Sequence, residues 1–159
     1  MKIGFTGTQQ GMTDAQKEKF IETLLKTSKV SFDKLFSTEN EFHHGDCIGA
    51  DVWAGGVAYE MGFLVVTHPP INESKRAYAS YNVELPAKPY LDRNHDIVDQ
   101  TDMLIATPKE VEEQLRSGTW VTIRYALKKR PRIKPVILIF PDGMIVEHRG
   151  IGDAIERKA

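Results

Sequence analysis

The sequence predicts an α/β fold with an open parallel sheet and helices on both of its faces. Short apolar runs alternate with helix-length amphipathic segments, which is the pattern of strand–helix units. A chain of 159 residues, 41% of them hydrophobic, is also long enough to bury a core of its own. We find neither internal repeats nor a low-complexity linker. Residues 1–159 are therefore expected to form one domain.

The amino-terminal half is expected to open with a strand–helix–strand–helix series. The apolar run 2–6 predicts the first strand, and helically spaced apolar residues predict a helix over 14–26. Thr13 is placed to cap the start of that helix. A second strand is expected over 41–44 and a second helix over 49–61.

The carboxyl-terminal half continues the alternation after a long loop. Pro69, Pro70, Pro86 and Pro89 break the segment 69–92, and a loop of this length more often binds or covers a ligand than merely connects. The other expected elements are a strand over 63–69, a short helix over 93–99, a strand over 103–108, a helix over 118–129, a strand over 135–140 and a turn with an edge strand over 142–149.

Composition narrows the classes of function. Lys and Arg total 21 against 22 acidic residues, so the net charge is −1, whereas nucleic-acid-binding proteins usually have a basic excess. Cys47 is the single cysteine, which suits a reducing compartment. The sequence has neither a signal-peptide pattern nor an apolar run long enough to span a membrane. We therefore expect a cytoplasmic protein without membrane partners, and nucleic acid is a disfavoured partner.

The stretch "HGDCIGAD", residues 44–51, lies between the second strand and the second helix. A metal site is disfavoured there because His43 and His44 point to opposite faces of a strand, and no other ligand pair shows zinc-site spacing. Glycine permits close backbone approach, and a helix start presents unpaired N–H groups, so the turn suits an anion. The plainer alternative is a turn in which Asp46 or Asp51 only caps the helix. We expect no metal and no cofactor.

Two similar places favour the anion hypothesis. "TGTQQG" follows the first strand, and "SGTW" opens the helix after the fourth strand. A strand order of 3-2-1-4-5 would bring all three motifs to one crevice at the carboxyl ends of the strands. The expected ligand-binding residues in these motifs are Thr6, Gly7, Thr8, Gly45, Asp46, Gly49, Ser117, Gly118 and Thr119.

A cation at this crevice is expected from "DRNHDIV". A guanidinium can clamp a phosphate by two parallel hydrogen bonds, which assigns Arg93 to the same anion as Thr119. The alternative is a surface ion pair of Arg93 with Asp92 or Asp96. Trp120 could stack on a base, but within an amphipathic helix it is expected in the core.

Taken together, these motifs resemble those of the SLOG superfamily of Rossmann-like nucleotide-ligand proteins. The resemblance is strongest to small bacterial and phage proteins of the YAcAr type. It runs from residue 1 to about 143 and rests on Thr6-Gly7, "HGDCIGAD", Arg93-Asn94, "LIATP" ending at Pro108, and Ser117-Gly118-Thr119. It implies a Rossmann-like domain that binds or senses a phosphorylated nucleoside-derived molecule, adds Asn94 and Pro108 to the expected binding residues, and favours a homo-oligomer.

The resemblance also implies an alternative activity. The lonely-guy type phosphoribohydrolases of the same superfamily cleave the base from a nucleoside monophosphate, a reaction that a carboxylate can assist by stabilising the sugar cation. The candidate acids are Asp46, Glu112 and Glu113, the last two in a charged loop that could cover the ligand. This chain has Thr122 where those enzymes carry a glutamate.

Some SLOG relatives bind single-stranded DNA, and the basic segment 128–134 allows the same here. Cations at the end of a helix also complement its dipole, and we favour that plainer role because the net charge is nearly zero.

Overall fold

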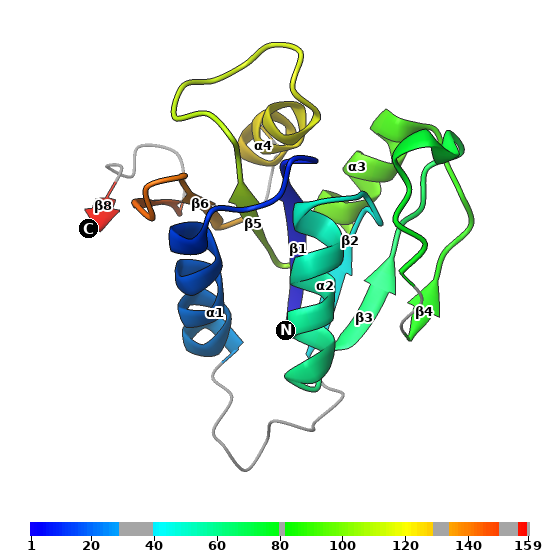
Figure 1. Ribbon diagram of the computed structural model, residues 1–159, viewed down its shortest axis with the longest axis horizontal. Helices are drawn as coiled ribbons and strands as arrows, with labels where there is room; N and C mark the ends of the chain where they lie inside the picture. Colours follow the sequence, from blue (N-terminus) through cyan, green and yellow to red (C-terminus); the bar gives the residue numbers. More distant parts are fainter. Residues whose placement is uncertain (29–39, 80–81, 129–133, 150–155, 159) are drawn as a thin grey trace.

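The computed structural model describes residues 1–28, 40–79, 82–128, 134–149 and 156–158. An eight-stranded, mostly parallel sheet forms its centre, in the order β4-β3-β2-β1-β5-β6-β7-β8 (Figure 1). The strands are β1 (Lys2–Gly7), β2 (Glu41–His44), β3 (Leu64–Thr67), β4 (Val83–Glu84), β5 (Met103–Thr107), β6 (Val136–Ile139), β7 (Ile145–His148) and β8 (Glu156–Lys158). The helices are α1 (Asp14–Ser28), α2 (Ala50–Glu60), α3 (Tyr90–Asp99) and α4 (Gly118–Lys128), with a short 3₁₀ turn, η2 (Glu73–Lys75).

The sheet differs from the predicted five-stranded order because strands extend it at both sides. The five predicted strands run β3-β2-β1-β5-β6, but β4 lies beyond β3, and β7 and β8 lie beyond β6. β4 has only two residues, too few for an alternating pattern to show in the sequence. β7 was predicted as an edge strand, and this is wrong because β8 pairs with its outer side.

Alternation along the strands separates the core into two layers. Ile3 and Phe5 of β1 face α1 and α2, together with Met103 and Ile105 of β5. The intervening Leu104 belongs to the opposite layer, under α3 and α4. Because successive strand residues point to opposite faces, this division follows from the apolar runs themselves. Figure 1 shows the two helix pairs on the two sides of the sheet.

Local sequence signals explain the helix ends. The Thr13 hydroxyl accepts a hydrogen bond from the Gln16 N–H at 3.1 Å, and the Gln16 side chain accepts one from the Thr13 N–H at 3.1 Å. This reciprocal pair is a capping box, so the predicted Thr13 cap is confirmed. α3 begins at Tyr90 rather than at Arg93, because Pro89 is its N-cap residue and fixes the chain at a φ of −52° just before the helix.

The long loop after β3 is held against the rest of the protein. The Ile48 N–H donates to the Lys75 carbonyl at 2.9 Å, and the Ala77 N–H donates to the Asp46 carbonyl at 2.7 Å. Two isolated bridges, Cys47 to Arg76 and Pro70 to Lys88, add further backbone contacts. The expected binding loop is therefore packed on the turn that follows β2.

Within the described residues, no helix is both long and apolar enough to cross a membrane. The basic segment 128–134 falls largely on residues 129–133, which lie outside the described part of the chain. Lys134 is described, and its ammonium donates to the carbonyls of Val98 and Asp99 at 2.5 and 3.1 Å. It thus complements the carboxyl end of α3.

Candidate functional site

A cavity of about 250 Å³ lies where β1 and β5 end and α4 begins. Four parts of the chain line it: residues 7–10 after β1, Tyr90 of α3, residues 109, 110 and 116 of the loop after β5, and residues 117–119 at the start of α4. The loop after β5 arches over the upper end of the sheet in Figure 1. Gly7, Thr8, Ser117, Gly118 and Thr119, all predicted to bind ligand, are thus brought together.

Strand pairing places these motifs side by side. Gly7 pairs with Thr107 at the end of the β1–β5 ladder, and the Thr8 N–H donates to the Thr107 carbonyl at 3.2 Å. The chain that leaves β5 therefore starts next to the turn that leaves β1. Thr6 pairs with Ala106 within the ladder, one position before the cavity-lining residues begin.

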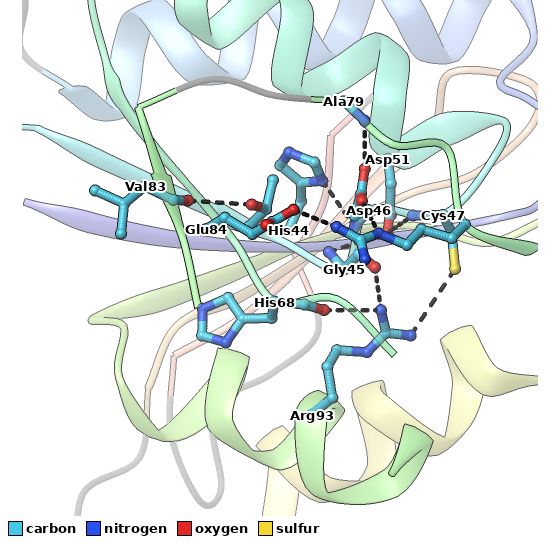
Figure 2. Close-up of polar contacts among 12 residues, drawn as sticks. His44, Gly45, Asp46, Cys47, Asp51, His68, Ala79, Val83, Glu84 and Arg93 are labelled. Carbon is cyan, nitrogen blue, oxygen red and sulfur yellow. Dashed lines mark hydrogen bonds and ion pairs between the residues drawn. The ribbon is translucent and has the colours of Figure 1, made fainter. Parts of the chain in front are cut away.

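The turn after β2 does hold an anion, but that anion belongs to the protein. The carboxylate of Asp51 accepts hydrogen bonds from the N–H groups of Gly45 and Cys47 at 3.1 and 3.3 Å (Figure 2). Burial raises the pKa of Asp51 to about 6. The N–H groups expected for a ligand are thus engaged by a side chain. The alternative in which Asp46 or Asp51 caps the helix is wrong as well, because the N-cap residue of α2 is Gly49 and no side chain caps this helix, while Asp51 binds the turn before it.

Arg93 lies beneath this turn rather than on the wall of the cavity. Its guanidinium is buried, and Nη1 donates to the carbonyls of Gly45 and His68, the second at 3.2 Å (Figure 2). A Cβ atom at Gly45 would overlap this guanidinium, so a larger residue there would displace Arg93. The expected clamp of one phosphate between Arg93 and Thr119 is not what these contacts form, because Nη1 is engaged by two carbonyls of the protein and Nη2 contacts Cys47 Sγ at 3.8 Å.

Asp46 fastens the long loop instead of facing the cavity. Its carboxylate accepts from Arg76 Nε and from the Ala79 N–H, both at 2.9 Å, and Arg76 also pairs with Glu84. The residue is fully buried and has a positive φ of 54°, which is uncommon outside glycine. A role for Asp46 as a ribose ligand or a catalytic acid would require this set of contacts to open.

The other predicted residues do not line the cavity. Gly49 has a φ of 89° and packs against the Gln9 carbonyl, to which a Cβ atom would come within 2.3 Å. Asn94 is buried within α3. The Pro108 carbonyl accepts from the Gln16 side chain at 2.8 Å. Gly49 and Pro108 thus adjoin residues that line the cavity, Gln9 and Lys109, whereas Asn94 is placed only within α3.

The predicted acids of the charged loop also point elsewhere. Glu113 pairs with Arg124 at 2.8 Å, and Glu112 and Glu113 are both exposed. The carboxylate that lines the cavity is Glu110, which accepts a hydrogen bond from Trp120 Nε1 at 3.3 Å. Trp120 is buried in the layer under α3 and α4, so its predicted core position is confirmed.

Tyr90, Lys109, Glu110 and Arg116 line the cavity although the sequence did not single them out. Lys109 and Arg116 flank a loop that is conspicuous in the sequence only for its length and charge. The one available signal was that Lys109 follows Pro108 and Arg116 precedes Ser117, because residues adjacent in sequence to predicted binding residues also lie close to the site. Tyr90 lies in the segment 69–92 that was expected to bind or cover a ligand, but no pattern distinguished it from the other residues of that segment.

A buried chain of histidines lies beside the turn. His43 contacts Glu41 through Nε2 and His68 through Nδ1, each at 2.8 Å. The hydrogen bond with His43 lowers the pKa of Glu41, while burial lowers the pKa of His43 and takes that of His68 to about 3. An ionised carboxylate can only accept, so His43 Nε2 donates to Glu41, and His68 Nε2 donates to His43 Nδ1. Across the described ranges, no group of three His, Cys, Asp or Glu side chains is arranged to hold a metal ion.

Comparison of the chain with protein-family models, with curated proteins and with solved structures gave no match.

Proposed function

We propose that the cavity at the ends of β1 and β5 binds the phosphate group of a nucleoside-derived small molecule, and that the protein binds or senses this ligand. The observation that carries the proposal is the meeting of Lys109 and Arg116 with the first turn of α4 in one cavity. The two cationic side chains and the helix start all attract negative charge, so together they favour an anionic ligand.

The position of the cavity in the sheet supports ligand binding. From β1 the chain passes to β2 and β3 on one side, then returns to β5 on the other side of β1. The strand order therefore reverses between β1 and β5. In open α/β sheets, ligands bind outside the carboxyl ends of the strands at such a reversal, which is where this cavity lies.

The donors that line the cavity suit an oxyanion. The first N–H groups of α4 have no partner within the helix, although the Ser117 hydroxyl accepts from the Trp120 N–H at 3.4 Å. Thr8 and Thr119 add hydroxyl groups. The absence of a side chain at Gly7 lets Ala50 and Thr107 pack closely, and at Gly118 it makes room for the Tyr90 hydroxyl. Glu110 adds a negative charge to the cavity lining, and its carboxylate accepts a hydrogen bond from Trp120 Nε1.

The nucleoside part of the proposal rests on the resemblance to the SLOG superfamily, with its Rossmann-like fold and its tendency to form homo-oligomers. Glu110 also keeps the glycosidase alternative open, because it places a carboxylate in the cavity where the predicted acids do not reach.

A panel of nucleotides tests the proposal. The melting temperature is measured with the 5′-monophosphates of the four ribonucleosides, with the free nucleosides and with signalling nucleotides, and each mixture is then chromatographed for released base. A melting-temperature rise with phosphorylated compounds alone and with no free base supports a binding or sensing protein. Release of base that depends on Glu110 supports the glycosidase. The absence of any shift and any release contradicts both.

A further inference from the structure

Tyr90 connects the cavity to the buried Arg93. As the first residue of α3, it reaches the cavity wall and keeps 37% of its surface exposed. The hydroxyl lies against the start of α4, because a Cβ atom at Gly118 would be 2.7 Å from the Tyr90 oxygen. A phenol group is thus presented beside the helix start at which the proposed phosphate binds.

Arg93 supports the Tyr90 ring from behind. The two residues are three positions apart on α3 and so share one face of the helix. The guanidinium carbon of Arg93 lies 4.5 Å from the centroid of the Tyr90 ring. Arg93 is itself fixed, since Nη1 donates to two carbonyls, while its buried Nε has no hydrogen-bond partner within the described residues. The guanidinium therefore acts as a fixed platform for the ring.

We propose that the Tyr90 hydroxyl is a direct ligand of the bound anion and that Arg93 is a positioning residue, which acts on the anion only through Tyr90. This inference rests on the proposed function and names residues of the same site. It gives Arg93 a role in phosphate binding although Arg93 does not line the cavity.

The chemistry of the phenol fits this role. A tyrosine hydroxyl keeps its proton at neutral pH, and burial raises the pKa of Tyr90 further, so this group can donate a hydrogen bond to an anion. A neutral donor next to the first N–H groups of α4 can share a phosphate oxygen with them. The expected ligand group is a phosphate monoester, which offers several accepting oxygens to these converging donors.

A double-mutant cycle tests the coupling. Tyr90→Phe removes the hydroxyl and retains the ring on Arg93, so its fold should be unchanged. Arg93→Lys removes the planar platform, and the cycle is completed by the double variant. Affinity is measured by calorimetry for the tightest of the 5′-monophosphates of adenosine, guanosine, cytidine and uridine, together with the melting temperature of each variant. Tyr125→Phe is the matched control, since that hydroxyl contacts Asp99 at 3.0 Å rather than the cavity.

We expect Tyr90→Phe to weaken nucleotide binding about tenfold or more without lowering the melting temperature, and Tyr125→Phe to leave affinity unchanged. Arg93→Lys should weaken binding when Tyr90 is present but hardly further when it is combined with Tyr90→Phe. Equal affinity of Tyr90→Phe and the unaltered protein would overturn the inference, as would an equal loss from Arg93→Lys in both backgrounds. Failure of the unaltered protein to bind any of the four nucleotides would overturn this inference, and failure to bind any phosphorylated compound of the panel would overturn the proposed function as well.

Discussion

The carboxylate of Asp51 accepts a hydrogen bond from the backbone N–H of Gly45 at 3.1 Å, so the turn after β2 is filled by an anion of the protein itself. The same carboxylate accepts from Cys47. This relationship moves the candidate ligand site away from the glycine-rich turn and toward β1, β5 and α4. It also makes Asp51 a test of the turn's structural role.

Replacing Asp51 by alanine should destabilise the fold strongly. Two buried N–H groups would lose their acceptor, and each unsatisfied group costs about 1–3 kcal/mol. Asp51→Asn is the matched control, because its carbonyl oxygen can still accept from both groups. The free energy of unfolding in urea at pH 7 should fall far more for Ala than for Asn. Similar losses in the two variants would show that the hydrogen bonds do not govern stability.

Protonation of the buried His43–His68 pair should destabilise the protein in acid. Burial takes the folded-state pKa of His68 to about 3, below its value of about 6.5 in an unfolded chain. The stability that this group contributes is therefore complete above about pH 6.5 and is lost as the pH falls toward 3. We expect the urea midpoint to drop between pH 7 and pH 4.5.

The variant His68→Gln should show a smaller drop over the same pH range. His95→Gln, which changes a histidine stacked on Tyr125 instead, is the control and should behave like the unaltered protein. An identical pH dependence for His68→Gln and the unaltered protein would exclude His68 as the cause. Asp51 acts in the opposite sense, since its raised pKa favours the neutral form, so its contribution is lost as the pH rises through about 6.

Asp46→Asn should loosen the long loop more than the sheet. The carboxylate of Asp46 joins Arg76 to the Ala79 N–H, and an amide cannot form the same ion pair. We expect faster hydrogen exchange at Ala77 and Ala79, with little change in β1 and β5. Exchange rates that stay the same in the loop would contradict the assigned role of Asp46.

Gly118→Ala should separate binding from stability. A Cβ atom would lie 2.7 Å from the Tyr90 hydroxyl and force the ring to shift, whereas alanine is well tolerated at the first position of a helix such as α4. The melting temperature should therefore be retained while nucleotide affinity falls. A variant that binds as well as the unaltered protein would show that the contact between Gly118 and Tyr90 is unimportant for the site.

The fold was readable from the sequence where a local pattern records it. The apolar run Val136–Ile139 and the alternation of Ile3 and Phe5 with Gly4 determine which faces are buried, and Thr13 marks the start of α1. The two-residue strand β4 is too short to show a hydrophobic pattern in the sequence. Its existence depends on the pairing of Val83 with Val66, a contact between distant segments.

The site was only partly readable for the same reason. Small residues at strand ends and a helix start predicted Gly7, Thr8 and residues 117–119 correctly as neighbours. The pairing of hydrogen-bond donors with acceptors, however, depends on the path of the chain in space. Spacing alone could not reveal that the Asp51 carboxylate accepts hydrogen bonds from the turn after β2. Nor could it reveal that the carbonyls of Gly45 and His68 accept hydrogen bonds from Arg93.

The central claim is that the charges at the cavity bind a phosphate. Calorimetric titration of the unaltered protein and Arg116→Ala with a 5′-mononucleotide and with its nucleoside tests it most directly. Lys2→Ala, which removes a cation at the opposite end of β1, is the control. We predict that the nucleotide binds at least about tenfold more tightly than the nucleoside, that Arg116→Ala removes most of this difference, and that Lys2→Ala leaves it intact, because a charged hydrogen bond contributes about 1.5–3 kcal/mol. Equal affinities for nucleotide and nucleoside, or an Arg116→Ala loss of the same size for both, would contradict the account.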